Sequence, residues 1–136
     1  MNAKKYIIGS LVVFIVMYAL EFGLHGMILA GAYNSIQHIL RPEADMMTYM
    51  PAMVIGFLLY AFGFCYLFTR GYEGKGIAES LRFGFYIGFF FGVSSAMIEY
   101  AVYPISGWIM LAYFIGYPIM NMIMGAVFAA IYKPAK

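Results

Sequence analysis

The stretch that decides the fold is residues 81–103, "LRFGFYIGFFFGVSSAMIEYAVY", which is apolar over almost its whole length. A helix needs about 20 apolar residues to cross the roughly 30 Å hydrocarbon core of a bilayer. Three further runs of similar character cover residues 6–32, 51–69 and 107–132. We therefore predict an all-α protein, a transmembrane four-helix bundle that forms a single domain over residues 1–136. Its one long connection is an outer loop at 33–50.

Composition supports contact with lipid. Hydrophobic residues make up 65% of the chain and charged residues only 10%, whereas about 25% of an ordinary soluble domain is charged. The net charge of +2 and the scattered basic residues argue against a nucleic-acid-binding surface. Cys65 is the only cysteine, which excludes a disulfide within the chain and a cysteine-based zinc site. The bilayer is the partner that this composition predicts.

The basic residues predict the orientation. Seven of the eight fall on one side of the predicted spans, and only Arg41 falls in the 33–50 loop; the seven are Lys4, Lys5, Arg70, Lys75, Arg82, Lys133 and Lys136. Loops rich in lysine and arginine stay in the cytoplasm. We expect both termini in the cytoplasm (N-in, C-in) and the 33–50 loop outside.

Glycine recurs at every fourth position of the third predicted helix, at Gly84, Gly88 and Gly92. At about 100° per residue these glycines share one face, and Glu99 falls within it. Small residues let helix backbones approach closely in lipid, where packing and polar contacts drive association. We predict that the three glycines pack against another helix and that Glu99 faces protein.

The first predicted helix has a polar side and a small side. Glu21 and His25 lie about 40° apart, with Tyr18 nearby, and the opposite side carries Ala19, Gly23, Gly26 and Ala30. Both sides are expected to contact helices, of this chain or of a second copy. An ionised acid at a helix centre is unfavourable by about 2.5–3.5 kcal/mol on insertion scales. Glu21 is therefore either protonated and donating a hydrogen bond, or ionised beside a protonated His25.

The polar residues of the spans form the candidate site for a ligand or for protons: Glu21, His25, Glu99, Asn121, Tyr18 and Tyr117. The leading interpretation is that they are interhelical hydrogen-bonding groups in a structural or accessory subunit, which associates with itself or with other membrane subunits. The alternative is a small proton-linked transporter or channel-like protein. No residue pattern indicates catalysis.

A third interpretation is a metal- or haem-binding membrane subunit, although no cofactor is predicted outright. Glu21, His25 and Glu99 are suitable ligands for zinc, iron or manganese, but a fourth donor would have to come from elsewhere. A haem with two histidine ligands would need a second imidazole, because His25 is the only histidine within a span. Only a homodimer would supply it.

Several stretches carry a resemblance to a known family. They are "GLHGMILAGAY" (23–33), "LRPEADMMTYMP" (40–51), "ESLRFGFYIGFFFG" (79–92), "VYPISGW" (102–108) and "NMIMGAVFAAIYKP" (121–134). Together they resemble a family of small bacterial four-span membrane proteins of unknown function. The resemblance implies a multi-pass protein of the bacterial inner membrane, and it assigns no functional residue.

Overall fold

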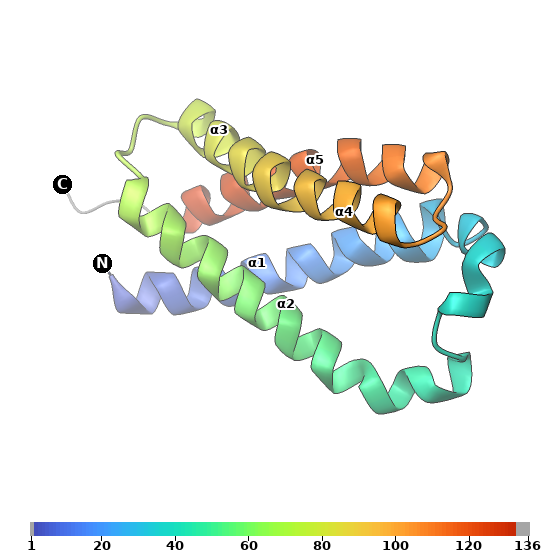
Figure 1. Ribbon diagram of the computed structural model, residues 1–136. Coiled ribbons are helices and arrows are strands. Elements are labelled where there is room, and N and C mark those ends of the chain that lie inside the picture. The colour runs from blue at the N-terminus through green and yellow to red at the C-terminus, as the bar shows by residue number, and fades with distance from the viewer. Residues whose placement is uncertain (1, 133–136) are drawn as a thin grey trace.

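The computed structural model describes residues 2–132, and every regular element in that range is a helix (Figure 1). The elements are α1 (Ala3–Glu21), η1 (Phe22–Ile28), η2 (Ala32–Ile39), α2 (Glu43–Gly71), α3 (Ile77–Ile87), η3 (Gly88–Val93), α4 (Ser94–Val102) and α5 (Gly107–Ile131). The π-helical segments η1 and η3 continue α1 and α3 without a break.

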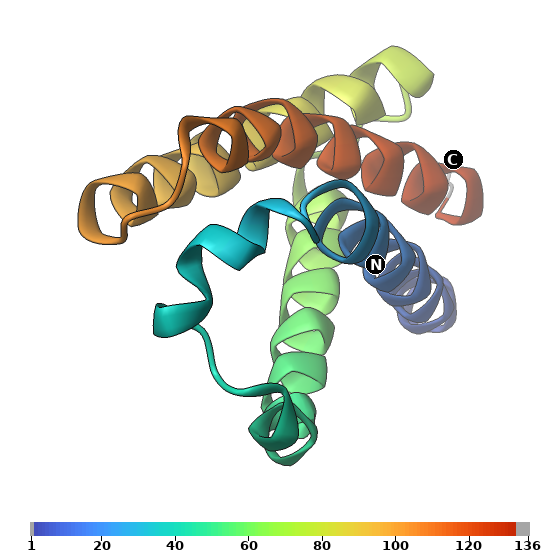
Figure 2. The same ribbon diagram turned by 90° about the vertical axis from the view of Figure 1, so that its right-hand side faces the viewer.

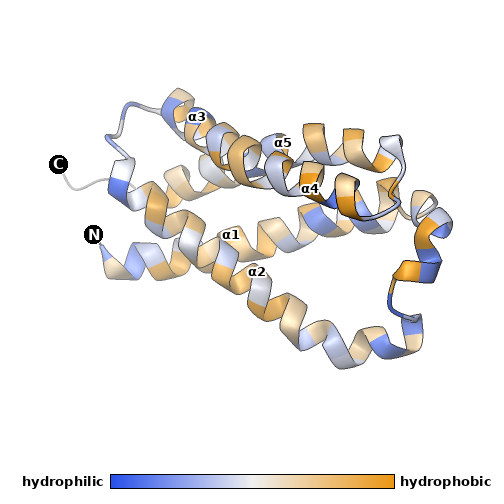
Figure 3. Ribbon diagram, viewed as in Figure 1, coloured by the Kyte–Doolittle hydropathy of each residue, from blue (hydrophilic) through white to orange (hydrophobic). Residues whose placement is uncertain are grey.

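Four long helices result, and each is long and apolar enough to cross a membrane. They cover Ala3–Ile28, Glu43–Gly71, Ile77–Val102 and Gly107–Ile131. Large apolar side chains point outward along them, for example Ile15, Leu59 and Phe90, which are each more than 60% exposed. Figure 3 shows this apolar character along the length of each helix. The predicted all-helical fold with four long apolar helices is confirmed.

The two ends of the molecule differ in charge. The start of α1, the end of α5 and the α2–α3 connection lie together (Figure 1), and we call this the terminal end. Residues 29–42 and 103–106 lie at the opposite end, the loop end. Among the described basic residues, the terminal end holds Lys4, Lys5, Arg70, Lys75 and Arg82, and the loop end holds Arg41. Lys133 and Lys136 lie outside the described residues.

The closest helix pair is α3–η3 against α5, and glycine makes that approach possible. A Cβ atom added at Gly84 would lie 2.2 Å from the carbonyl oxygen of Asn121, and one at Gly88 would lie 2.5 Å from that of Tyr117. At Gly92 it would lie 2.6 Å from the Cβ of Tyr117. From the other side, Gly125 of α5 lies against the Ser80 carbonyl. The glycine face predicted from the sequence therefore lies directly on the α5 backbone.

Helix α2 packs on the others along its second half, from Phe57 toward the terminal end. Its buried residues Ala61, Phe64, Cys65 and Phe68 join a core cluster with α1 and α5. A second buried cluster, toward the loop end, contains residues of α1, η1, η2, α4 and α5 but none of α2. Figure 2, which looks onto the loop end, shows α2 standing apart from the other long helices there. This divergence leaves space between the first half of α2 and the remaining helices.

The helix boundaries differ from the expected ones at the loop end. The first helix ends at Ile28 instead of residue 32, and a 3₁₀-helix follows at Ala32–Ile39. The second helix begins at Glu43 instead of residue 51 and runs through Pro51. A proline leaves the carbonyl four residues earlier without its helical hydrogen bond. Here that residue is Met47, which is 74% exposed. The loop expected at 33–50 is thus largely helical.

The small side of the first helix finds no neighbour in the chain. A Cβ atom at Gly23 would meet nothing within 4 Å, and one at Gly26 would meet only the ring of Phe22 on the same helix. Ala19 and Ala30 are exposed, and Ala30 lies in the turn after η1. Of the two expected contacts, with helices of this chain or with a second copy, the first is not made, because α1 meets α2 and α5 through other faces. Contact with a second copy stays a prediction.

Candidate ligand and proton site

The side chains of Glu21 and His25 pair one turn apart on the first helix, and the pair is ionic when the imidazole is protonated. Glu21 is the last residue of α1 and His25 lies in the π-helical η1, and the distance from His25 Nε2 to Glu21 Oε2 is 3.0 Å. The side chain of Glu21 is 15% exposed and that of His25 is 35% exposed. π-Helical turns inside α-helices are frequent at functional sites. This pairing of Glu21 with His25 is the one that their spacing on the first helix predicted.

The other imidazole nitrogen extends the pair into a chain of hydrogen bonds. His25 Nδ1 is bonded to the hydroxyl of Tyr33, and that hydroxyl lies 2.9 Å from the hydroxyl of Tyr113. The ring of His25 stacks on Tyr33, with 5.9 Å between centroids. Burial raises the pKa of Tyr33 well above its usual range, so its phenol stays neutral. The chain runs from Glu21 through three aromatic side chains and joins the first helix, η2 and α5.

This chain permits two hydrogen-bond directions. A neutral His25 that donates from Nε2 to Glu21 accepts at Nδ1 from the Tyr33 hydroxyl, which then accepts from Tyr113. A protonated His25 donates from both nitrogens, and Tyr33 then donates to Tyr113. The protonation state of His25 therefore sets the direction of the hydrogen bonds as far as Tyr113 of α5, and the hydroxyl groups need only rotate to change it.

A second polar group lies deeper, at the contact of α2 with α5. The hydroxyl of Tyr60 donates to Asn121 Oδ1 at 2.8 Å, and Asn121 Nδ2 donates to the carbonyl of Tyr117 at 2.8 Å. Asn121 is only 5% exposed. A buried amide is costly unless both of its ends are paired. Tyr60 thus gives α2 a specific polar contact at the inner limit of the space left by its divergence.

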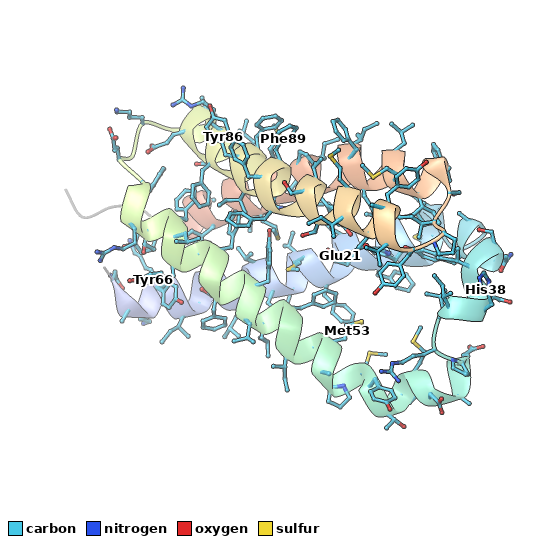
Figure 4. The ribbon with its side chains drawn as sticks, viewed as in Figure 1. Glu21, His38, Met53, Tyr66, Tyr86 and Phe89 are labelled. Atoms are coloured by element: carbon cyan, nitrogen blue, oxygen red, sulfur yellow. The ribbon has the colours of Figure 1, made fainter. Side chains whose placement is uncertain are left out.

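A cavity of about 450 Å³ lies between α2 and the other helices. Glu21 of the first polar group lines it, as do Tyr60 and Asn121 of the second. Polar side chains on the wall come from all four long helices: Glu21, Tyr60, Ser95, Glu99, Tyr117 and Asn121. The remaining wall is apolar and is built mainly of methionine and phenylalanine. Figure 4 labels Glu21 and Met53, which reach this space from α1 and from α2. Such a volume is in the range of small-molecule sites.

The structure brings together four of the six candidate residues on the cavity wall: Glu21, Glu99, Tyr117 and Asn121. His25 lies behind Glu21, as its ion-pair partner. Tyr18 does not join them; its ring packs edge-on against Phe57, with 5.8 Å between centroids. Glu99 was expected to face protein; it lines the cavity but is itself exposed. Its side chain forms no hydrogen bond or ion pair with any residue in the range 2–132.

The expected metal-ligand set of Glu21, His25 and Glu99 is not assembled. Within residues 2–132, no three histidine, cysteine, aspartate or glutamate side chains come close enough to hold a metal ion. Glu99 comes from α4 and stands on the cavity wall apart from the pair.

Three tyrosines of the site escaped the sequence analysis. Tyr33, Tyr60 and Tyr113 are not among the residues that the sequence predicted for the site. A signal exists for one of them: Tyr113, Tyr117 and Asn121 are spaced by four on one helix and therefore share a face. Tyr33 and Tyr60 lie on other elements, and only the tertiary arrangement brings them to their partners.

Comparison with known proteins adds no further constraint on the site. No family model matches the sequence, and neither a curated protein nor a solved structure is significantly similar to the chain.

Proposed function

We propose that the chain is a small multi-pass protein of the bacterial inner membrane that binds a small solute in the α2 cavity and links binding to protonation of the Glu21–His25 pair. The charge difference between the two ends supports an N-in, C-in orientation, because five of the six described basic residues lie at the terminal end. In that orientation the cavity lies toward the outer side of the membrane. The protein is then a proton-linked transporter of minimal size.

One observation carries this proposal: Glu21, which is paired with His25 at 3.0 Å, lies on the wall of a 450 Å³ cavity that a second acid, Glu99, also lines. Ionisable side chains within membrane helices are costly and therefore rare, and those that occur mark substrate and proton paths. Polar residues that served only to hold helices together would form hydrogen bonds with one another, and a cavity between them would not be required. Glu99 faces the cavity without a polar partner, which such a structural role does not explain.

Proton linkage follows from what surrounds Glu21. The groups that face it or its partner come from every neighbouring element, and apart from Glu99 they are His25 and neutral phenols: Tyr33 from η2, Tyr60 from α2, and Tyr113 and Tyr117 from α5. No lysine or arginine of residues 2–132 lines the cavity. A change of charge in the cavity therefore acts on Glu21 and His25 with little compensation from other groups.

Charge movement after a pH jump tests the proposal without knowledge of the solute. Proteoliposomes adsorbed on a solid-supported membrane should give a transient current when the external pH is stepped, because protons bind inside the membrane field. Glu21→Gln should abolish this current. Glu43→Gln, the same chemical change at the exposed start of α2, should leave it intact. Equal currents from the wild type and Glu21→Gln would contradict proton binding at this site.

A second candidate function is that of a structural or accessory subunit, alone or as a homo-oligomer. The observation that favours it is the open small side of the first helix, where a side chain at Gly23 would meet nothing within 4 Å. Lipid-embedded helices associate through such surfaces. Gly23→Leu should then release a partner or a second copy that co-purifies in mild detergent, whereas Gly63→Leu, which is equally open on α2, should not.

A further inference from the structure

The wall of the α2 cavity combines acids with aromatic rings. Phe57 and Tyr60 come from α2, Phe91 from η3 and Tyr117 from α5, while Glu21 and Glu99 contribute carboxyl groups. Aromatic faces attract cations, and quaternary ammonium groups are held in cages of such rings. Carboxylates add a full charge to that attraction. Both features of the wall favour a positively charged occupant.

The charge balance of the cavity indicates how many positive charges the occupant carries. Glu21 already has a basic partner in His25, at 3.0 Å. Glu99 has none among residues 2–132, and no lysine or arginine lines the cavity. Glu99 is exposed and lacks a counter-charge, and an isolated charge within a membrane-spanning helix is unfavourable. A single positive charge would complete the site.

The rest of the wall argues for an organic cation instead of a metal ion. A hard metal ion requires about six oxygen ligands at short distance, and no cluster of acids, histidines or cysteines in residues 2–132 provides them. The wall instead presents Met17, Met53, Met120 and Met124. Methionine is flexible and polarisable, and it adapts to apolar groups of varied shape.

From these features we propose, building on the proposed solute site, that the cavity binds an organic monocation with an apolar body, whose charge lies near Glu99 and whose apolar part lies among the aromatic and methionine side chains. A cavity within the membrane suits such a ligand. The apolar part of the ligand partitions from water, and its charge requires an oppositely charged partner within the cavity.

Space for this ligand depends on a small residue of α2. Gly56 lines the cavity, and a Cβ atom added there would meet nothing within 4 Å. A larger side chain at this position would fill the cavity without striking the backbone. Gly63, about two turns further along the same helix, is equally open and lies outside this cavity. The two positions form a matched pair for mutation.

The test compares phenyltrimethylammonium with tert-butylbenzene, which has the same shape but carries no charge. Saturable binding of each is measured to the full chain in lipid nanodiscs. The cation should bind, and the neutral isostere should bind at least about tenfold more weakly. Glu99→Gln should weaken binding of the cation by about tenfold and leave the isostere unaffected, while Glu43→Gln changes neither. Gly56→Leu should abolish saturable binding that Gly63→Leu retains.

The outcomes separate this inference from the proposed function. Equal binding of both probes, or binding of the cation that Glu99→Gln does not weaken, would overturn the inference while leaving the cavity as a solute site. Absence of cation binding beside a normal pH-jump current would overturn the ligand class only. Absence of both the binding and the current would overturn both proposals. Helix content and elution as a single species show that each variant is folded.

Discussion

Replacing Gly84 by alanine should destabilise the protein more than the same replacement at the other glycines of the four long helices. The new Cβ would lie 2.2 Å from the carbonyl oxygen of Asn121 and 2.6 Å from the Cα of Met122. Ordinary contacts begin at 3.4 Å, so the two helices would have to separate locally by about 1.2 Å. All three nearest atoms belong to the backbone of α5, and no side-chain rotation can relieve the contact.

The expected magnitude combines two opposing effects. Overpacking of a tight contact costs about 1–3 kcal/mol, and the upper part of that range applies because rigid backbone is displaced. Alanine has a better helix propensity than glycine, by about 1 kcal/mol. We expect Gly84→Ala to lower the free energy of unfolding by about 2 kcal/mol. Gly63→Ala adds the same methyl group with nothing within 4 Å, and it should be neutral or stabilising by up to about 1 kcal/mol.

Both variants are to be measured by steric trapping or by SDS titration in mixed micelles, with circular dichroism as the signal. Gly84→Ala should also disturb the site, because the clash falls on the residue that holds Tyr60. If the two variants unfold with the same midpoint, the close approach of α3 to α5 does not exist in the protein, and the reasoning from glycine packing is wrong.

Three further predictions concern the site and the topology. Tyr60→Phe leaves the buried Oδ1 of Asn121 without its donor, and it should cost about 1–3 kcal/mol in the same unfolding assay; no loss would show that water replaces the hydroxyl. Cys65, fully buried, should react with a maleimide only after unfolding, and prompt labelling of the folded protein would contradict the α1–α2–α5 core. Because that cysteine is protected, single cysteines at exposed positions report topology: a membrane-impermeant maleimide added to intact cells should label His38→Cys at the loop end and not Glu73→Cys at the terminal end. Labelling of the second alone would reverse the proposed orientation.

Hydropathy was sufficient to locate the four long helices, because a bilayer imposes length and composition on each span independently of the others. Boundaries were less predictable. Pro51 was taken as the edge of a helix that in fact begins at Glu43, since a proline is tolerated where its freed carbonyl can be satisfied. The end of the first helix was placed too late because the chain turns at residues 29–31, directly after η1.

The sequence predicted which residues share a helix face, because that depends on one helix. It did not predict which neighbour each face contacts, because that depends on several helices. The glycines at 84, 88 and 92 lie on α5 as their regular spacing suggested. The small side around Gly23 has no neighbour in the chain, because a small surface indicates that close packing is possible without naming the partner. Glu21 and His25 pair through i,i+4 spacing, a local relation that the sequence contains in full.

By itself, the sequence determined the helical class, the four apolar spans and the position of the acid–imidazole pair, because each depends on residues within a few turns of one helix. The tertiary structure alone decided that α2 leaves the other helices toward the loop end, that a cavity forms there, and that Tyr33, Tyr60 and Tyr113 reach their partners from separate elements. The physical reason is that cavities and interhelical hydrogen bonds depend on relative helix placement, which arises from many weak long-range contacts and leaves no periodic signal in a single segment.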